Sequence, residues 1–255
     1  MALTYDGAFV WGLVAASSLV IGAVIAFLFH ISTRVVGLIM GFGAGVLISA
    51  VAFDLIEEAL AETSGHGTIA VGIFAGCLVF FLGDRAIDGL GGAERKDPEG
   101  VEPTNASASG GGGSSLSIVL GTVLDGIPES LVIGLTIFKG GAVGFAYLIA
   151  VFISNLPESI SASTGLLASG WSKSKVVGMW IGIAIISAVA SVLGYTLFQD
   201  ASPDVLAFVL AFAGGAILTM LANTMMPEAF EHGGKLTGIA VTLGFAVAFT
   251  VHVLG

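Results

Sequence analysis

The chain has 255 residues, of which 56% are hydrophobic and only 10% are charged, and its formal net charge is −10. About a quarter of the residues in a soluble domain are charged, so this composition excludes a soluble protein and indicates one embedded in a lipid bilayer. The eight Lys and Arg residues are scattered and form no basic patch, which argues against nucleic acid as a partner.

Apolar runs of about 20 residues predict transmembrane helices. Eight such spans are expected, and in chain order they cover residues 8–29, 36–60, 68–82, 116–138, 142–167, 176–198, 205–226 and 236–254. Glycine is abundant, with 38 residues. Because small residues let membrane helices approach closely, a tightly packed helical bundle is expected.

The basic residues predict the orientation of these spans. Seven of the eight lie in loops on one side, and only Lys139 lies on the side of the termini. The positive-inside rule then places both termini outside the cytoplasm. The long loop 84–115 lies on the cytoplasmic side, and its four consecutive glycines, Gly110 to Gly113, are typical of a flexible tether.

Two glycine-rich segments indicate an internal repeat. Segment 41–45 leads after twelve residues to Glu58, and segment 211–215 leads with the same spacing to Glu228. The two spans run in opposite directions, so they match as parts of an inverted repeat, as is common in secondary transporters. The alternative is a chance likeness between two glycine-rich helices.

The predicted fold class is therefore all-α: a polytopic membrane protein of eight transmembrane helices in a 3+2+3 inverted-repeat architecture, with both termini extracytoplasmic. Residues 1–83 form the first three-helix repeat and 84–115 the flexible cytoplasmic loop. Residues 116–169 form a central two-helix unit with the metal site, and 170–255 form the second repeat.

A Pro-Glu-Ser motif occurs twice inside predicted spans, at 128–130 and 157–159. A charged side chain at the bilayer centre costs about 2.5 to 3.5 kcal/mol and usually marks an ion pathway. Each proline removes one helical hydrogen bond, which frees the carbonyl groups of Leu124 and Ile153. Carboxylates beside free carbonyl groups are suited to binding a cation.

Neighbouring residues complete the predicted site. Asp125 and Glu129 are four residues apart and so share one helix face, and Ser154 and Glu158 repeat this spacing. The predicted metal ligands are Asp125, Glu129, Asn155, Glu158 and Ser154. No basic residue within a span can neutralise these acids, so their counter-charge is either protons or a bound cation. The alternative is that the carboxyl groups are protonated and purely structural.

These motifs resemble those of the ZIP (Zrt/Irt-like) divalent-metal transporters, whose fourth helix typically reads His-Asn-x-Pro-Glu-Gly. Asp125 stands at the usual His position, Gly126 at the Asn position and Ser130 at the Gly position. On the fifth helix Ser154 and Asn155 replace the usual ligands. The sixth span has no carboxylate, so part of the ligand set for a second ion is missing.

The resemblance implies a secondary transporter in the cell membrane that takes up divalent cations of the zinc, iron or manganese class by an elevator-like motion. The metal ion is the substrate, no organic cofactor is expected, and a homodimer is an open alternative for the assembly. The oxygen-only ligand set favours Mn²⁺, Fe²⁺, Mg²⁺ or Ca²⁺ over zinc on local chemistry, although zinc also binds carboxylates.

Two other functions compete with transport. An intramembrane enzyme would need two acids around a water or an activated nucleophile, and no span holds a convincing Ser/His pair, so no enzymatic activity is expected. A metal sensor or a structural membrane protein that has lost part of the family's site fits the missing histidine.

Outside the central site, Asp54 is a candidate vestibule residue, whereas His252 is expected at the membrane interface.

Overall fold

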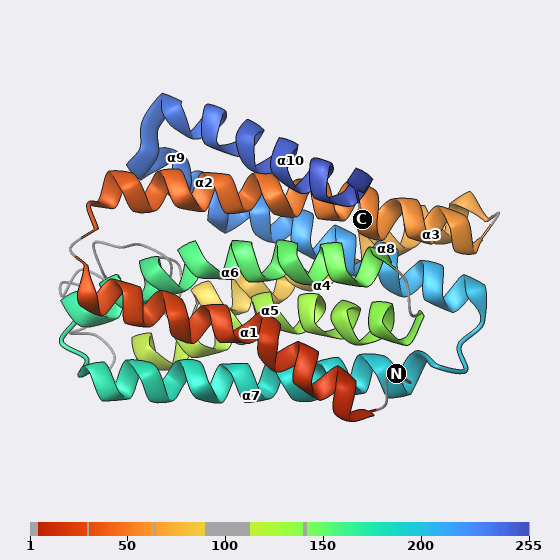
Figure 1. Cartoon of the computed structure of the whole chain (residues 1–255), viewed down its shortest axis with the longest axis horizontal. Helices are drawn as coiled ribbons and strands as arrows, with labels where there is room; N and C mark the ends of the chain where they lie inside the picture. The colour runs from red at the N-terminus through yellow and green to blue at the C-terminus, as the bar shows by residue number, and fades with distance from the viewer. Residues whose placement is uncertain (1–4, 30, 64, 90–112, 140–141, 255) are drawn as a thin grey trace.

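The structure, a computed structural model, describes residues 5–29, 31–63, 65–89, 113–139 and 142–254. All of the secondary structure in these ranges is helical (Figure 1). The elements are α1 (Tyr5–Leu28), α2 (Thr33–Ser49), the π-helical segment η1 (Ala50–Ile56), α3 (Glu57–Glu62), α4 (His66–Asp88), α5 (Gly113–Lys139), α6 (Ala142–Ala168), α7 (Lys173–Phe198), α8 (Pro203–Met220), the π-helical segment η3 (Leu221–Met225), α9 (Met226–Gly233), the 3₁₀ turn η4 (Gly234–Leu236) and α10 (Thr237–Leu254).

Local signals set several helix boundaries. Ser32 and Ser172 have extended backbones, and their hydroxyl groups accept hydrogen bonds from the amides of Val35 and Lys175, which caps the first turns of α2 and α7. Proline opens α8 at Pro203, where its missing N–H is not needed. Gly234 has a φ of 62°, a conformation that favours glycine, and it turns the chain from α9 into α10.

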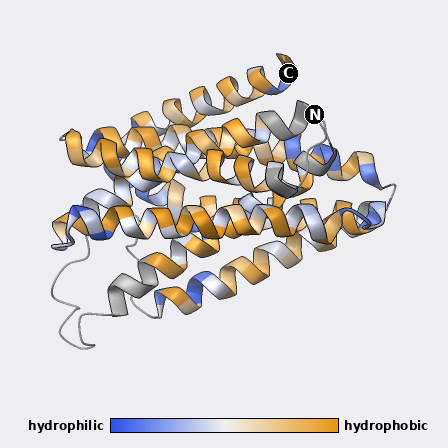
Figure 2. Ribbon diagram, turned by 60° about the horizontal axis from the view of Figure 1, so that its bottom comes forward, coloured by the Kyte–Doolittle hydropathy of each residue, from blue (hydrophilic) through white to orange (hydrophobic). Residues whose placement is uncertain are grey.

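Six stretches of the described chain are long and apolar enough to cross a membrane. The last of them, Pro203–Leu254, contains the turn at Gly234. Apolar residues cover the helices along their lengths, while hydrophilic residues gather towards their ends (Figure 2). Large apolar side chains such as Phe74 and Leu82 are 64% and 61% exposed, as lipid contact requires. The prediction of a polytopic helical membrane protein is confirmed, and the count of eight spans stays a prediction.

The helices form two groups. In the first, α1 packs against α6 and α7, and α5 packs against α7. In the second, α4 packs against α8, and α2 packs against α10 and α9. Figure 1 shows α1 and α7 towards one edge of the bundle and α2 with α10 along the opposite edge. Within the first group, α1, α6 and α7 form an apolar cluster that includes the fully buried Trp180. Buried apolar residues of α5 and α6 also pack in a larger core shared with the second group.

Glycine allows the closest helix contacts in the second group. A side chain at Gly45 of α2 would collide with the carbonyl oxygen of Val241 on α10, and one at Gly215 of α8 would collide with that of Ile73 on α4. Gly45 and Gly215 are the matching last residues of the two glycine-rich segments. The two π-helical segments, η1 and η3, follow them at nearly matching positions.

The helices around the long loop extend further than expected. The third span was expected to end at Leu82, but α4 continues to Asp88, and α5 already begins at Gly113. Residues 90–112, which make up most of the predicted tether, lie outside the described residues. Arg85 lies in the last turn of α4, where a positive charge interacts favourably with the helix dipole.

Candidate metal site

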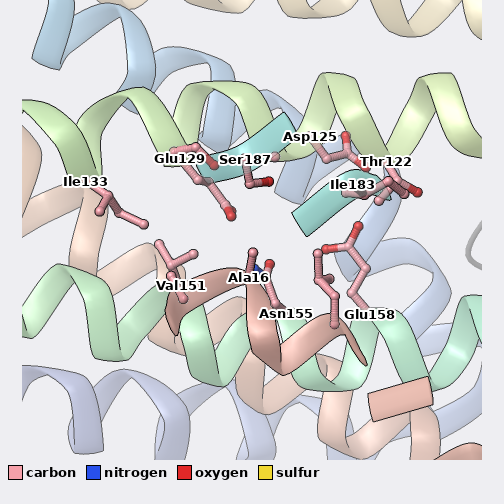
Figure 3. Close-up of a pocket in the computed structure, with 14 residues that line it drawn as sticks. Ala16, Thr122, Asp125, Glu129, Ile133, Val151, Asn155, Glu158, Ile183 and Ser187 are labelled. Carbon is pink, nitrogen blue, oxygen red and sulfur yellow. The ribbon is translucent and has the colours of Figure 1, made fainter. Parts of the chain in front are cut away.

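A small cavity lies inside the first helix group, between α5 and α6 and closed by α1 and α7 (Figure 3). Its volume is about 10 Å³, which is room for about one water molecule. The residues that line it are Ala15, Ala16, Leu19, Thr122, Asp125, Gly126, Glu129, Ser130, Ile133, Val151, Asn155, Glu158, Ile183 and Ser187.

Four of the five residues predicted as metal ligands line this cavity. Asp125 and Glu129 come from α5, and Asn155 and Glu158 come from α6. All four are at most 9% exposed. In Figure 3, Glu129 reaches into the gap from the α5 side, and Asn155 and Glu158 approach it from the α6 side. The structure therefore brings both copies of the Pro-Glu-Ser motif to one cavity.

Ser154, the fifth predicted ligand, does not line the cavity. Its hydroxyl group donates a hydrogen bond to the carbonyl oxygen of Val151 at 3.0 Å, within α6. Its backbone lies against α2, where a side chain added at Gly43 would come within 3.3 Å of the Ser154 Cα. Ser154 thus belongs to the contact between the two helix groups.

Both helices continue through their prolines. Pro128 lies inside α5, which runs unbroken over 27 residues, and Pro157 lies inside α6, which has the same length. A single proline removes only one backbone hydrogen bond, and packing against neighbouring helices can hold the remaining helix together. Each glutamate is therefore held on a continuous helix directly after its proline.

Hydroxyl groups missing from the sequence-based site also line the cavity. Thr122 precedes Asp125 by three residues on α5, a spacing that could have identified it. Ser187 comes from α7, the predicted sixth span that lacks a carboxylate, and Figure 3 shows it beside Glu129. Serine is common in apolar membrane helices, so no signal in the sequence separates Ser187 from the other serines of that span.

The cavity offers oxygen ligands to a cation. Its polar side chains are carboxylates, hydroxyl groups and one amide, and none of the described residues that line it is Lys, Arg, His or Cys. Across the described residues, no group of three or more His, Cys, Asp or Glu side chains is placed to hold a metal ion. A cation here would therefore need neutral oxygens, such as those of Asn155 and Ser187, in addition to carboxylates.

A second acidic position lies outside this cavity. Asp54 of η1 is 3% exposed, and its Oδ1 lies 2.7 Å from Nδ1 of His252 on α10. The sequence placed these residues on separate spans without connecting them. His252, expected only as an interfacial residue, is thus a direct partner of a buried carboxylate.

No family model matches the chain, but curated zinc transporters do. It is 25% identical to zinc transporter ZIP11 of Homo sapiens over 96% of this chain and 94% of that protein. It is 27% identical to zinc transporter ZupT of Escherichia coli over 85% of this chain and 86% of ZupT. A protein of Arabidopsis thaliana named as a candidate zinc transporter is 26% identical over 86% of this chain, which spans only 34% of that protein's length.

Proposed function

Because the chain is a divergent relative of zinc transporters of the ZIP family, we propose that it moves divalent metal cations across the cell membrane through a site between α5 and α6. The site consists of Asp125, Glu129, Asn155 and Glu158. Thr122 and Ser187 supply further oxygens. The metal ion is the cargo, and no organic cofactor takes part.

The observation that carries this proposal is that three carboxylates line one buried cavity. Asp125 and Glu129 are each 3% exposed, and Glu158 is 6% exposed. Carboxylate oxygens are common ligands of divalent cations. The described lining residues include no basic side chain that would repel a cation, so the chemistry of the cavity favours a bound cation.

The ligand chemistry narrows the choice of cargo. The names of the relatives favour zinc, and zinc accepts carboxylate ligands. A site without imidazole or thiolate also suits harder ions such as Mn²⁺ and Fe²⁺. The proposed cargo class is therefore Zn²⁺, Fe²⁺ and Mn²⁺, with weaker discrimination against manganese than a histidine-containing site would have.

We further propose eight spans in an inverted repeat of three, two and three helices, with both termini outside the cytoplasm. The helix contacts support this arrangement, because they repeat when α1, α2, α4 and α5 are exchanged with α7, α8, α10 and α6. The α2–α10 contact then corresponds to α8–α4, and α1–α6 corresponds to α7–α5. The matched crossings at Gly45 and Gly215 support it as well.

The moving unit in this proposal is the first helix group. α5 packs mainly against α7, and α6 packs mainly against α1. The cavity is enclosed by these same four helices. A cation held inside one rigid group is carried when that group slides against the other. We therefore assign α1, α5, α6 and α7 to an elevator-like body and α2, α4, α8 and α10 to a stationary frame.

Flux through purified protein tests the proposed function. Proteoliposomes that contain a metal-sensitive dye should take up zinc or manganese with the wild-type chain. Replacing a direct ligand, Glu129→Ala or Glu158→Ala, should lower the rate by about tenfold or more. Glu57→Ala is the matched control, because Glu57 is exposed on α3 and outside the cavity.

The outcomes separate transport from the alternatives. Flux by the wild type and the control, with loss in both cavity variants, supports the proposed site. Equal flux in all four proteins would contradict it. Binding measured by calorimetry without any flux would instead favour a metal sensor, and neither binding nor flux would leave a structural role.

A further inference from the structure

A buried carboxylate lies outside the proposed metal site and is paired with a histidine. Asp54 of η1 is 3% exposed, and its Oδ1 lies 2.7 Å from Nδ1 of His252 on α10. The side chain of His252 is 22% exposed, so the pair can exchange a proton with water at the molecular surface. Histidine is the side chain that most readily changes its charge near neutral pH. The pair can therefore gain or lose one proton while it keeps its hydrogen bond.

The fold itself does not require a carboxylate at this position. Asp54 comes nine residues after Gly45, and Thr224 comes nine residues after Gly215, the matching glycine of the other repeat. Thr224 is also buried, but its hydroxyl group donates a hydrogen bond to the carbonyl oxygen of Met220, one turn earlier. A neutral side chain thus fills the equivalent position in η3, so the carboxylate in η1 calls for a role beyond packing.

Asp54 lines a second small cavity, which lies between the proposed body and frame. The volume of this cavity is about 10 Å³, and its walls come from α2, η1 and α10 on the frame side and from α6 on the body side. The residues of α6 that line it are Ala146, Ile149, Ala150 and Ile153. Among the described lining residues, Asp54 is the only one with a polar side chain. An apolar surface of α6 therefore covers the carboxylate.

The net charge of the pair depends on one proton. With the proton bound, the imidazolium and the carboxylate cancel to a net charge of zero. Without it, the neutral imidazole still donates its Nδ1 hydrogen to the carboxylate, and a net negative charge remains. A buried charge without a counter-charge is costly. The apolar cover of α6 therefore favours the proton-bound pair, whereas the proton-free pair favours a position of α6 that admits water to Asp54.

Other titratable groups near Asp54 do not balance its charge. Besides its histidine partner, the described side chains that interact with it electrostatically are Glu57 of α3, which is exposed, and Tyr147 of α6. α8 also packs against η1, and its acid, Asp204, is hydrogen-bonded elsewhere. None of these groups is basic, so the proton on the pair is the positive charge that offsets the carboxylate.

We propose that the Asp54–His252 pair is a proton-binding site that links the position of α6 to pH. The inference rests on the proposed transport function and its moving body. The state described here, with α6 over Asp54, binds the proton more tightly than a state in which water reaches Asp54. By linkage, a low pH favours the state that binds the proton more tightly. Because the body must leave this state in each transport cycle, flux falls as the pH falls.

The test is the ratio of manganese flux at pH 8 to that at pH 6 in proteoliposomes, with the pH equal on both sides. One proton shifts a linked equilibrium by up to about tenfold per pH unit. We expect the wild-type ratio to exceed that of His252→Gln by about threefold or more, because this variant has no imidazole to hold the proton. The double variant Asp54→Asn with His252→Gln is always neutral and should also have a small ratio. At pH 8 its flux should be about threefold or more below that of His252→Gln, which keeps the carboxylate charge.

His232→Gln on α9 is the matched control, because it removes an imidazole outside both cavities, and it should keep the wild-type ratio. Manganese affinity measured by calorimetry at pH 8 should agree within about twofold in all four proteins, because the ligands of the proposed metal site are intact. Absence of wild-type flux would refute the transport function itself. Wild-type flux with the same ratio in both variants of the pair would overturn only the proton site. A loss of manganese affinity in these variants would also overturn it, because the pair would then be a metal ligand or a structural element.

Discussion

The identity of one residue, Asp125, sets much of the chemistry of the proposed site. It lies in the wall of the metal cavity at 3% exposure. The ZIP resemblance places a histidine at this position, and imidazole favours zinc more strongly than carboxylate does. In the proposed site, we therefore expect Asp125 to broaden the range of cargo towards ions that prefer oxygen.

Asp125→His should shift selectivity towards zinc. We expect the ratio of zinc flux to manganese flux to rise severalfold, because imidazole replaces a hard oxygen ligand with a nitrogen ligand. Competition between the two ions in proteoliposomes measures this ratio. Asp125→Asn is the control, since it keeps an oxygen while removing the charge. An unchanged ratio in Asp125→His would show that Asp125 does not contact the ion.

The acids of the site could be predicted because a carboxylate in an apolar span is rare. The hydroxyl groups of the site, those of Thr122 and Ser187, were not predicted, because serine and threonine are common in such spans. Spacing alone also placed Ser154 with Glu158, although its side chain bonds within α6. Successive residues are about 100° apart around a helix. Val151, Asn155 and Glu158 therefore share one face of α6, and this face lines the cavity. Ser154 falls on the edge of that face, which only the position of α2 reveals.

At the scale of elements, α6 separates two kinds of contact. One side packs against α1, where a side-chain Cβ at Gly22 would lie 3.1 Å from the Cβ of Ser159. Another side meets α2, where a Cβ at Gly43 would lie 3.3 Å from the Cα of Ser154. The first contact lies within the proposed moving body, and the second lies between body and frame.

Engineered disulfides across these contacts should have opposite effects on flux. In a Cys77→Ser background, oxidation of the pair Gly43→Cys with Ser154→Cys should stop transport reversibly, because it ties the body to the frame. Oxidation of the pair Gly22→Cys with Ser159→Cys should leave transport unchanged. The Gly22–Ser159 separation of 3.1 Å is shorter than the Cβ–Cβ distance of about 3.5 to 4.5 Å in a disulfide. A Cβ at Gly22 would also lie 2.7 Å from the carbonyl oxygen of Leu156, so α1 must shift away from α6 before this bond forms. A Cβ at Gly43 lies 3.3 Å from the Cα of Ser154, which brings the other pair within reach of a disulfide.

Flux before oxidation shows whether each cysteine pair still folds, and mass spectrometry of the free thiols shows whether the disulfide forms. A formed Gly43–Ser154 cross-link that leaves flux intact would contradict sliding between the groups. Equal loss in both oxidised pairs would contradict the assignment of α1 to the moving body.

Helix positions followed well from apolar runs, but two features of the elements did not. The sequences of residues 50–56 and 221–225 do not reveal that their backbone is π-helical and not α-helical, because either type of helix buries the same apolar side chains. Each proline was predicted to remove one helical hydrogen bond, and the sequence alone does not show whether the helix then ends or continues; α5 and α6 continue through Pro128 and Pro157. Contacts with neighbouring helices, which a single segment does not encode, decide both outcomes.

At the scale of the whole molecule, composition was sufficient to predict a helical membrane protein, and the likeness to named zinc transporters over most of the chain agrees with it. The division into two helix groups was not predicted. Sequence placed the central two helices apart from both repeats, whereas α1 and α7 pack around them. Pairing between distant helices depends on shape complementarity. At Gly134 of α5 and Gly194 of α7, for example, a side chain would collide with a backbone carbonyl group of the other helix, and the sequence pattern alone does not show that these two glycines meet.

The location of the bound ion tests the central claim most directly. Anomalous diffraction from crystals of the wild-type chain grown with zinc or manganese should show a peak in the cavity bounded by Glu129, Asn155 and Glu158. The double variant Glu129→Ala with Glu158→Ala should lose that peak. A wild-type crystal whose bound metal lies only outside this cavity would contradict the proposed site.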